Sequence, residues 1–217
     1  MDIQNIQAAL KNEGLLAISE SKQVGLDCVQ VTSAAGPVFF IRLSFLRITD
    51  PSFFTEGAVF NQVQTEDILN AALTFAAERK AEDYLSRCEQ CRAGLERKLI
   101  LKGFSKDSIS VALDYLEGRN LLSDKRYCES WLRTHGLIKK YGRIRLFNEL
   151  LSKGIDRKIC NECIDSFFIE NSEEEFCRFM YEKGISRGKH GENLIKYLID
   201  SGFSYRLVKS TIKNKTE

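Results

Sequence analysis

Two pairs of cysteines have the spacing of metal ligands or of a thiol redox motif. Cys88 and Cys91 form one Cys-x2-Cys pair, and Cys160 and Cys163 form the other. Structural zinc sites use such pairs, because two thiolates three residues apart can reach one tetrahedral ion. Zinc or thiol chemistry is therefore the first hypothesis that the sequence raises.

Other catalytic patterns are weak. The segment 184–190 holds two glycines and a lysine, but it is one residue short of the phosphate-binding Walker A spacing and lacks its Ser or Thr. The chain has two histidines, His135 and His190, and no Ser or Cys stands in a nucleophile-elbow sequence. We therefore predict a protein that is not an enzyme and that needs no cofactor.

A sequence frame that occurs three times organises most of the chain. It reads L-x3-L-x3-G-[FI]-x4-[ICV]-x3-[LI], and its glycines are Gly103, Gly154 and Gly202, which lie 51 and then 48 residues apart. Such self-similarity is typical of chains built from copies of one supersecondary unit. Aromatic residues upstream of each leucine pair, such as Tyr127 and Trp131, indicate one more helix per copy. The sequence thus predicts three-helix repeats of about 50 residues, stacked in an elongated array.

Each glycine of the frame is predicted to end one helix and lead into the next. Two leucines four residues apart form an apolar stripe, and the glycine four residues later suits the C′ position, where φ is positive. An apolar residue follows the glycine, and then comes a residue that favours the N-cap position: Ser105, Asp156 or Ser204. We expect a helix, a glycine corner and a second helix at all three places.

The frame gives the second cysteine pair a simpler role than metal binding. Cys160 occupies the position of Ile109 and Val208, and Cys163 occupies the position of Ala112 and Thr211, so small or apolar residues fill both positions elsewhere. Because a free cysteine behaves as a small buried hydrophobe, we favour core packing and predict no metal site. The first pair lies outside the frame, so this argument does not cover it.

The residues before the repeats predict a small antiparallel β domain. Segments 26–32 and 38–45 are rich in β-branched and aromatic residues and are separated by Ala-Ala-Gly-Pro, while 15–19 is the candidate third strand. The residues expected to share one face of the second segment are Phe39, Ile41, Leu43 and Phe45.

A long helix is predicted to connect this sheet to the first repeat. Thr65 is a suitable N-cap, and no helix breaker occurs before Arg92. Ser123 or Asp124, and later Ser172, are expected to cap the first helices of the second and third repeats. The domain limits that we predict are 1–64 for the β domain and 65–120, 121–168 and 169–217 for the repeats.

Composition indicates a helical cytoplasmic protein. The chain has 217 residues, of which 29% are charged and only two are proline. The sequence has no apolar run near the roughly 18 residues that a membrane span needs, and it begins without a basic leader. We expect no membrane association, and we expect the seven cysteines to be free thiols.

Positive charge is concentrated in the middle of the chain. The formal net charge of the whole chain is +2, but the segment 133–158 alone has eight Lys or Arg against two acidic residues. Such a segment is as consistent with a solvated helical face as with an anionic partner. Aromatic residues at helical spacing are expected in the core, whereas Tyr141, which lies in a basic loop, is a candidate for stacking on a nucleic-acid base.

Taken together, these residues resemble the RecX family of bacterial recombination regulators. The match depends on L-L-S-D-K-R-Y-C-x2-W at 121–131, on G-x2-R-L-x2-E-L-x2-K-G-I at 142–155, and on Y-L-S-R with the first copy of the frame at 84–104. The chain departs from the family pattern at two positions, since Ser123 replaces an acidic residue and Cys128 replaces an alanine. Neither change removes a cap or a core position.

The resemblance implies a regulator that binds the RecA–single-stranded DNA filament and restrains RecA in homologous recombination, DNA repair and the SOS response. It implies a monomer whose partners are the filament and single-stranded DNA, with double-stranded DNA as a further candidate. The alternative is a helical protein that binds DNA by itself with little sequence preference. The candidate contacts, of which Arg126 and Lys153 are motif positions, are Arg87, Arg92, Arg126, Lys139, Lys140, Tyr141, Arg143, Arg145, Lys153, Arg157 and Lys158.

Overall fold

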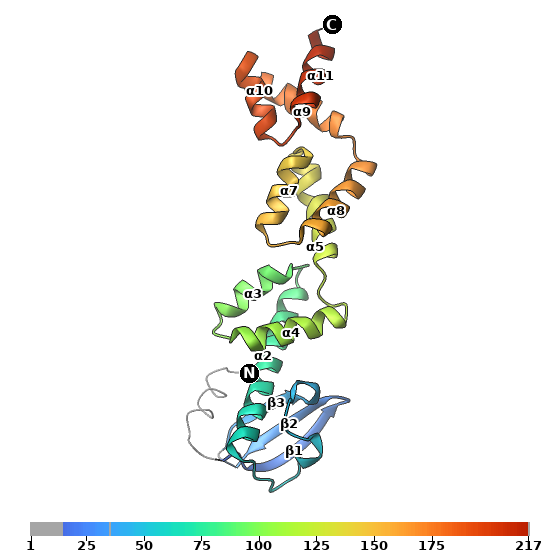
Figure 1. Cartoon of the computed structure of the whole chain (residues 1–217). Coiled ribbons are helices and arrows are strands. Elements are labelled where there is room, and N and C mark those ends of the chain that lie inside the picture. The colour runs from blue at the N-terminus through green and yellow to red at the C-terminus, as the bar shows by residue number, and fades with distance from the viewer. Residues whose placement is uncertain (1–14, 35, 217) are drawn as a thin grey trace. The chain divides into compact units, whose positions relative to one another are not determined.

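The structure is a computed structural model that describes residues 15–34 and 36–216. The described chain is mostly helical and has a three-stranded antiparallel sheet before the helices, which confirms the predicted fold class (Figure 1). The chain forms two compact units. Unit 1 contains the chain up to Cys88 together with Leu95–Leu122, and unit 2 contains Glu89–Gly94 together with the chain from Ser123 onwards.

The sheet of unit 1 is an antiparallel meander. Its strands, in spatial order, are β1 (Ile18–Gly25), β2 (Cys28–Ser33) and β3 (Val38–Arg42). Alternate side chains of β2 and β3 are buried, among them Val31, Phe39 and Ile41. This alternation is the pattern of a sheet with one face in the core.

Two details of the predicted strands are wrong. The first strand lies at Ile18–Gly25 rather than at 15–19, and the third strand ends at Arg42, so that Leu43–Phe45 form a 3₁₀ turn. Asp27 explains the early end, because its backbone carbonyl accepts from the N–H of Leu43 (3.0 Å) and its carboxylate accepts from the N–H of Ser44 (3.1 Å). The backbone N–H groups of Leu43 and Ser44 therefore find their hydrogen-bond acceptors in a turn, and the strand does not continue.

Helix α2 (Gln62–Leu85) packs against β3 and connects the sheet to the first repeat (Figure 1). The predicted cap at Thr65 is wrong, because Asn61 and Gln64 form a capping box one turn earlier, with bonds of 2.9 and 3.2 Å. Thr65 lies inside the helix, where its hydroxyl accepts from the N–H of Leu16 (3.2 Å). The helix also ends before Arg92, with Ser86 as its C-cap.

Two sets of charged interactions connect the elements of unit 1. Arg42 on β3 donates to the fully buried carboxylate of Glu78 on α2 (2.8 Å) and lies 4.3 Å from the centre of the Tyr115 ring. The carboxylate of Asp67 accepts three backbone N–H groups, from Arg47, Ile48 and Thr49, at 2.8–3.0 Å. Burial alone would raise the pKa of Asp67, but these bonds lower it below its ordinary value.

The remaining helices form the three repeats (Figure 1). After α2, repeat 1 contains α3 (Arg92–Ile100) and α4 (Lys106–Gly118). Repeat 2 contains α5 (Asp124–Trp131), which continues through a π-helical turn (Leu132–Gly136) into α6 (Leu137–Lys139), and then α7 (Arg143–Ser152) and α8 (Arg157–Glu170). Repeat 3 contains α9 (Glu173–Ser186), α10 (Gly191–Asp200) and α11 (Tyr205–Thr216).

The three predicted glycine corners are confirmed and have the same hydrogen bonds. Gly103, Gly154 and Gly202 have φ values of 87°, 90° and 97°. Each glycine N–H donates to the carbonyl three residues earlier, and the next N–H donates to the carbonyl five residues before it, at 2.8–3.4 Å. This is the Schellman pattern. The predicted caps follow, since Ser105, Asp156 and Ser204 all accept backbone N–H groups.

Most cysteines fill the core of unit 2. Cys128, Cys160, Cys163 and Cys177 are all buried among apolar side chains, which confirms the packing role that the frame predicted for Cys160 and Cys163. The predicted caps Ser123 and Ser172 also accept the backbone N–H groups that a cap requires.

Candidate functional site

Seven of the candidate basic residues of repeat 2 lie in or beside the two ends of α7. The N-terminal basic group contains Lys139, Lys140, Arg143 and Arg145, and the corner basic group contains Lys153, Arg157 and Lys158. Since α7 has ten residues, its ends are about 15 Å apart. The sequence predicted this set from charge, with Lys153 also at a motif position, and the structure divides it into two groups.

The junction between repeats 2 and 3 positions the N-terminal basic group. The N–H of Gly142 donates to the carbonyl of Ser201 (2.9 Å), and the N–H of Ile144 donates to the carbonyl of Gly202 (3.1 Å). The N–H of Arg143 donates to the Glu173 carboxylate (2.9 Å). A Cβ on Gly142 would lie 2.4 Å from the Gly202 carbonyl oxygen, so only glycine allows this contact.

The arginines of this group already have partners within the fold. Arg143 forms an ion pair with Asp165, and Arg145 pairs with Glu149 at 2.9 Å. The guanidinium of Arg145 also lies 3.8 Å from the centre of the Tyr141 ring. Tyr141 is consequently half-buried, and a base that stacked on it would share the ring with Arg145.

Lys140 adopts an unusual backbone conformation and covers two aromatic rings. Its φ is 51°, and its ammonium lies 4.6 Å from the ring centre of Phe176 and 5.5 Å from that of Phe179. Phe179 is one of the aromatic residues at helical spacing, most of which were expected in the core, but its side chain is exposed. The buried residues of α9 show why: Phe176, Cys177, Met180 and Gly184 occupy one arc of the helix at 100° per residue, and Phe179 falls outside it.

The corner basic group lies over the aromatic residues of repeat 2. Lys153 lies 5.5 Å from the ring centre of Trp131, which stacks on His135 with a centroid distance of 4.8 Å. Arg157 lies 5.5 Å from the ring centre of Phe147. Of the motif aromatics, Trp131 is buried as predicted, whereas Tyr127 is half-buried.

Three of the candidates are exposed and carry a charge that no acidic group of the described residues offsets. Among the described residues, the side chains of Arg87, Lys139 and Lys158 make no hydrogen bond or ion pair. By contrast, Arg126 pairs with Glu89 at 2.9 Å, and the backbone N–H of Arg92 donates to Asp124 (2.7 Å). Exposed cations without partners pay the smallest desolvation cost when a phosphate or carboxylate binds.

The thiols of unit 2 are buried, whereas Cys88 is exposed and Cys28 is half-buried. Burial raises the pKa of Cys160 to about 11, which keeps it protonated at neutral pH. Cys128 donates its S–H to Cys163, which raises the pKa of Cys128 and lowers that of Cys163. Within residues 15–34 and 36–216, no three His, Cys, Asp or Glu side chains lie where they could hold one metal ion.

Comparison with known proteins places these features in a family. A family model described as "RecX, second three-helix domain" matches residues 123–164. A relative from Ralstonia pickettii named "Regulatory protein RecX" is 30% identical over 142 residues, which cover 64% of this chain and 87% of that protein. The chain belongs to the RecX family. A second RecX relative, from Chlorobaculum tepidum, is 31% identical over 127 residues, 56% of this chain and 77% of that protein.

Solved structures of the RecX family have the same fold. A crystal structure of regulatory protein RecX aligns with a TM-score of 0.72 at 20% identity, over 92% of this chain and all of that chain. RecX from Lactobacillus salivarius aligns with a TM-score of 0.58 at 26% identity, over 65% of this chain and 96% of that chain. The RecX relatives are named regulatory proteins rather than enzymes. Where the structure describes the chain, none of its helices is long and apolar enough to cross a bilayer.

Proposed function

We propose that this RecX family member binds the RecA–single-stranded DNA filament and restrains the recombinase, ATPase and coprotease activities of RecA. Its membership in a family of regulatory proteins supports this assignment. The proposed action is non-catalytic. The protein binds to the surface of the filament and thereby lowers the activities of the RecA subunits that it covers.

The observation that carries the proposal is the pair of basic groups at the ends of α7. Both groups lie in repeat 2, in the segment where eight basic residues face two acidic ones. Asp165 and Glu149 hold Arg143 and Arg145 in place and offset their charge, so the arginines shape the surface while the lysines carry its net positive charge. Lys139 and Lys158 supply the exposed, unpaired charge at each end.

Repetition supports a polymer as the partner. A filament presents the same surface at regular intervals, and a chain of equivalent three-helix repeats can engage more than one of these surfaces. When one repeat has bound, the next binds at a high effective concentration, so weak individual contacts add up to a stable complex. A monomer therefore suffices for tight binding in this scheme.

The test compares binding of the wild-type chain with that of Lys139→Glu, Lys158→Glu and the double variant. The ligand is fluorescent single-stranded DNA, either naked or coated with RecA and a non-hydrolysable ATP analogue. We expect each reversal to weaken filament binding by about fivefold or more and to lower the salt slope by about 0.7 per lost phosphate contact. Lys196→Glu, on an exposed position of α10, is the matched control and should change little.

The same titration distinguishes a regulator that binds the RecA filament from the alternative, a protein that binds DNA by itself. Filament affinity that is unchanged in the double variant would contradict the assignment of these lysines. Binding to naked DNA that is as tight as binding to the filament would instead favour a stand-alone DNA-binding protein. The other candidates, Arg87, Arg92, Arg126 and Tyr141, are proposed as secondary contacts and rank below the two lysines in this test.

A further inference from the structure

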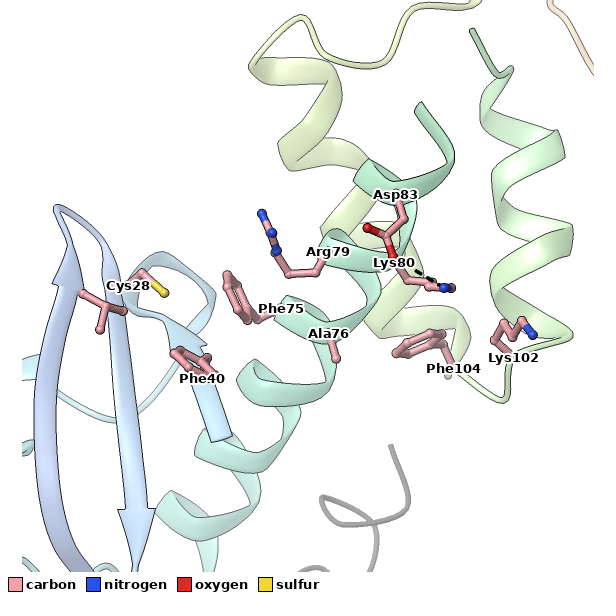
Figure 2. A pocket seen from close by; sticks show the side chains of 10 residues that line it. Cys28, Phe40, Phe75, Ala76, Arg79, Lys80, Asp83, Lys102 and Phe104 are labelled. Carbon is pink, nitrogen blue, oxygen red and sulfur yellow. Dashed lines mark hydrogen bonds and ion pairs between the residues drawn. The ribbon is translucent and has the colours of Figure 1, made fainter. Parts of the chain in front are cut away.

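Unit 1 contains a trough that the basic groups of repeat 2 do not involve. It lies between the sheet, the second half of α2 and the α3–α4 corner, and its volume is about 710 Å³ (Figure 2). Ligand pockets commonly have volumes of about 300–1,000 Å³. The trough is therefore large enough for several linked side chains.

The floor of the trough is aromatic. Phe40 comes from β3, Phe75 from α2 and Phe104 from the α3–α4 corner, as Figure 2 shows. Phe75 and Phe104 are each only 7% exposed. So little exposed surface does not offer a ring face on which a nucleic-acid base could stack. A single apolar side chain that fills the space between the rings suits the floor better.

The rim of the trough is positively charged. Arg79 and Lys80 on α2 form exposed pairs with Glu82 (2.6 Å) and Asp83 (3.4 Å). Exposed pairs of this kind contribute about 0–1 kcal/mol, so a ligand carboxylate can replace the acidic partner at little cost. Lys102 is exposed and has no side-chain partner among the described residues. Three cations against Asp83 make the lining net positive.

The third wall favours a peptide over a small anion. Val24 lines the trough from β1, which is an edge strand of the described sheet, and it is 47% exposed. This exposed apolar side chain adds to the apolar surface of the floor. An apolar surface beside a cationic rim matches a segment that carries both a large apolar side chain and carboxylates, as an acidic peptide does.

We propose that the trough binds a short acidic peptide segment of a partner protein that carries one large apolar side chain. The apolar side chain enters between Phe40, Phe75 and Phe104, and flanking Asp or Glu residues meet Arg79 and Lys102. The site is separate from the filament contacts proposed above, so either assignment can fail without the other.

The test measures fluorescence anisotropy of a labelled peptide in which one Leu is flanked by Asp and Glu, with the full-length chain as titrant. Arg79→Glu and Lys102→Glu should each weaken binding about fivefold, and together about 25-fold, since each reversal removes one exposed charge contact. Lys106→Glu is the matched control, because Lys106 is exposed on α4 but does not line the trough; it should change affinity less than about twofold.

A second pair of measurements tests the apolar anchor. Val24→Trp, at an exposed strand position where an aromatic side chain is tolerated, should block the trough without changing charge and should abolish peptide binding. Replacing the Leu of the peptide by Ser should also abolish peptide binding, because the peptide then lacks its apolar side chain. Circular dichroism confirms that the variants are folded.

Three results would overturn the proposal. The first is peptide binding that survives both charge reversals and the Ser replacement. The second is tighter binding of a thymidine oligonucleotide that depends on Arg79 and Lys102, which would assign the trough to nucleic acid. The third is self-association of the chain that the same reversals abolish, which would make a second copy the occupant.

Discussion

Replacing Gly202 by alanine should destabilise unit 2 more than the equivalent change at Gly103 destabilises unit 1. Both glycines have a positive φ, so a Cβ costs about 1–2 kcal/mol at either corner. At Gly103 nothing lies within 4 Å of the added atom. At Gly202 the Cβ would lie 2.4 Å from the Cβ of Arg145 and 2.5 Å from its backbone nitrogen.

The difference between the two variants can be given a magnitude. Backbone atoms cannot turn aside as a flexible side chain can, so α7 must shift and the bond from the N–H of Ile144 to the Gly202 carbonyl (3.1 Å) must lengthen. Overpacking of this kind costs about 1–3 kcal/mol. We expect a total loss of about 2–5 kcal/mol for Gly202→Ala, against about 1–2 kcal/mol for Gly103→Ala.

Trp131 provides a selective assay, because it is the single tryptophan of the chain and lies in unit 2. Urea unfolding followed by its fluorescence should show a midpoint lowered by about 1–2.5 M in Gly202→Ala, for an m value near 2 kcal/mol/M. Gly103→Ala should leave that transition unchanged and instead speed hydrogen exchange in α3 and α4. Equal fluorescence midpoints for Gly202→Ala and the wild type would refute the reasoning.

Two further predictions concern unit 1 and are read by hydrogen exchange. Arg42→Leu should cost about 3–5 kcal/mol, because it leaves the buried Glu78 carboxylate unpaired, and Arg42→Leu with Glu78→Leu should recover most of that loss. A single variant as stable as the double one would contradict this. The lowered pKa of Asp67 stabilises the folded state above its ordinary pKa of about 3.9, and this stabilisation is lost as the pH falls through the folded value. Asp67→Asn should therefore destabilise the chain at neutral pH but much less in acid; an equal loss at both pH values would refute it.

The repeat architecture was predictable because its signals are local. A glycine at C′, the apolar residue after it and a capping Ser or Asp specify the corner within a few residues, and the structure has all three corners where the frame placed them. The burial of Cys160 and Cys163 was predictable for the same reason, since the frame aligned them with small or apolar residues, whereas the burial of Cys91, outside the frame, was not. The domain limits at 64, 120 and 168 stay predictions.

The errors arose where distant residues decide the local structure. Asn61 could be recognised as a cap only through its pairing with Gln64. Thr65 lies inside the helix, and its hydroxyl accepts a hydrogen bond from the backbone N–H of Leu16, which is 49 residues away in sequence. The end of β3 depends on Asp27, which is far from it in sequence. No local pattern encodes such contacts.

The candidate site was predictable in composition but not in detail. Charge counting identified the basic segment, yet it could not separate Arg143 and Arg145, which pair with acids of the fold, from the unpaired Lys139 and Lys158. That distinction depends on which acidic residues the helix packing brings near. The exposure of Phe179 can be explained from helical periodicity, because four other α9 residues already fill the buried arc.

The most direct test of the proposed function is the rate of ATP hydrolysis by RecA on single-stranded DNA as this chain is added. The account predicts that the rate falls at ratios of chain to RecA near one or below, and that Lys139→Glu with Lys158→Glu restores most of it. An ATPase rate that stays constant with a RecA from the same species, at ratios well above one, would contradict the account.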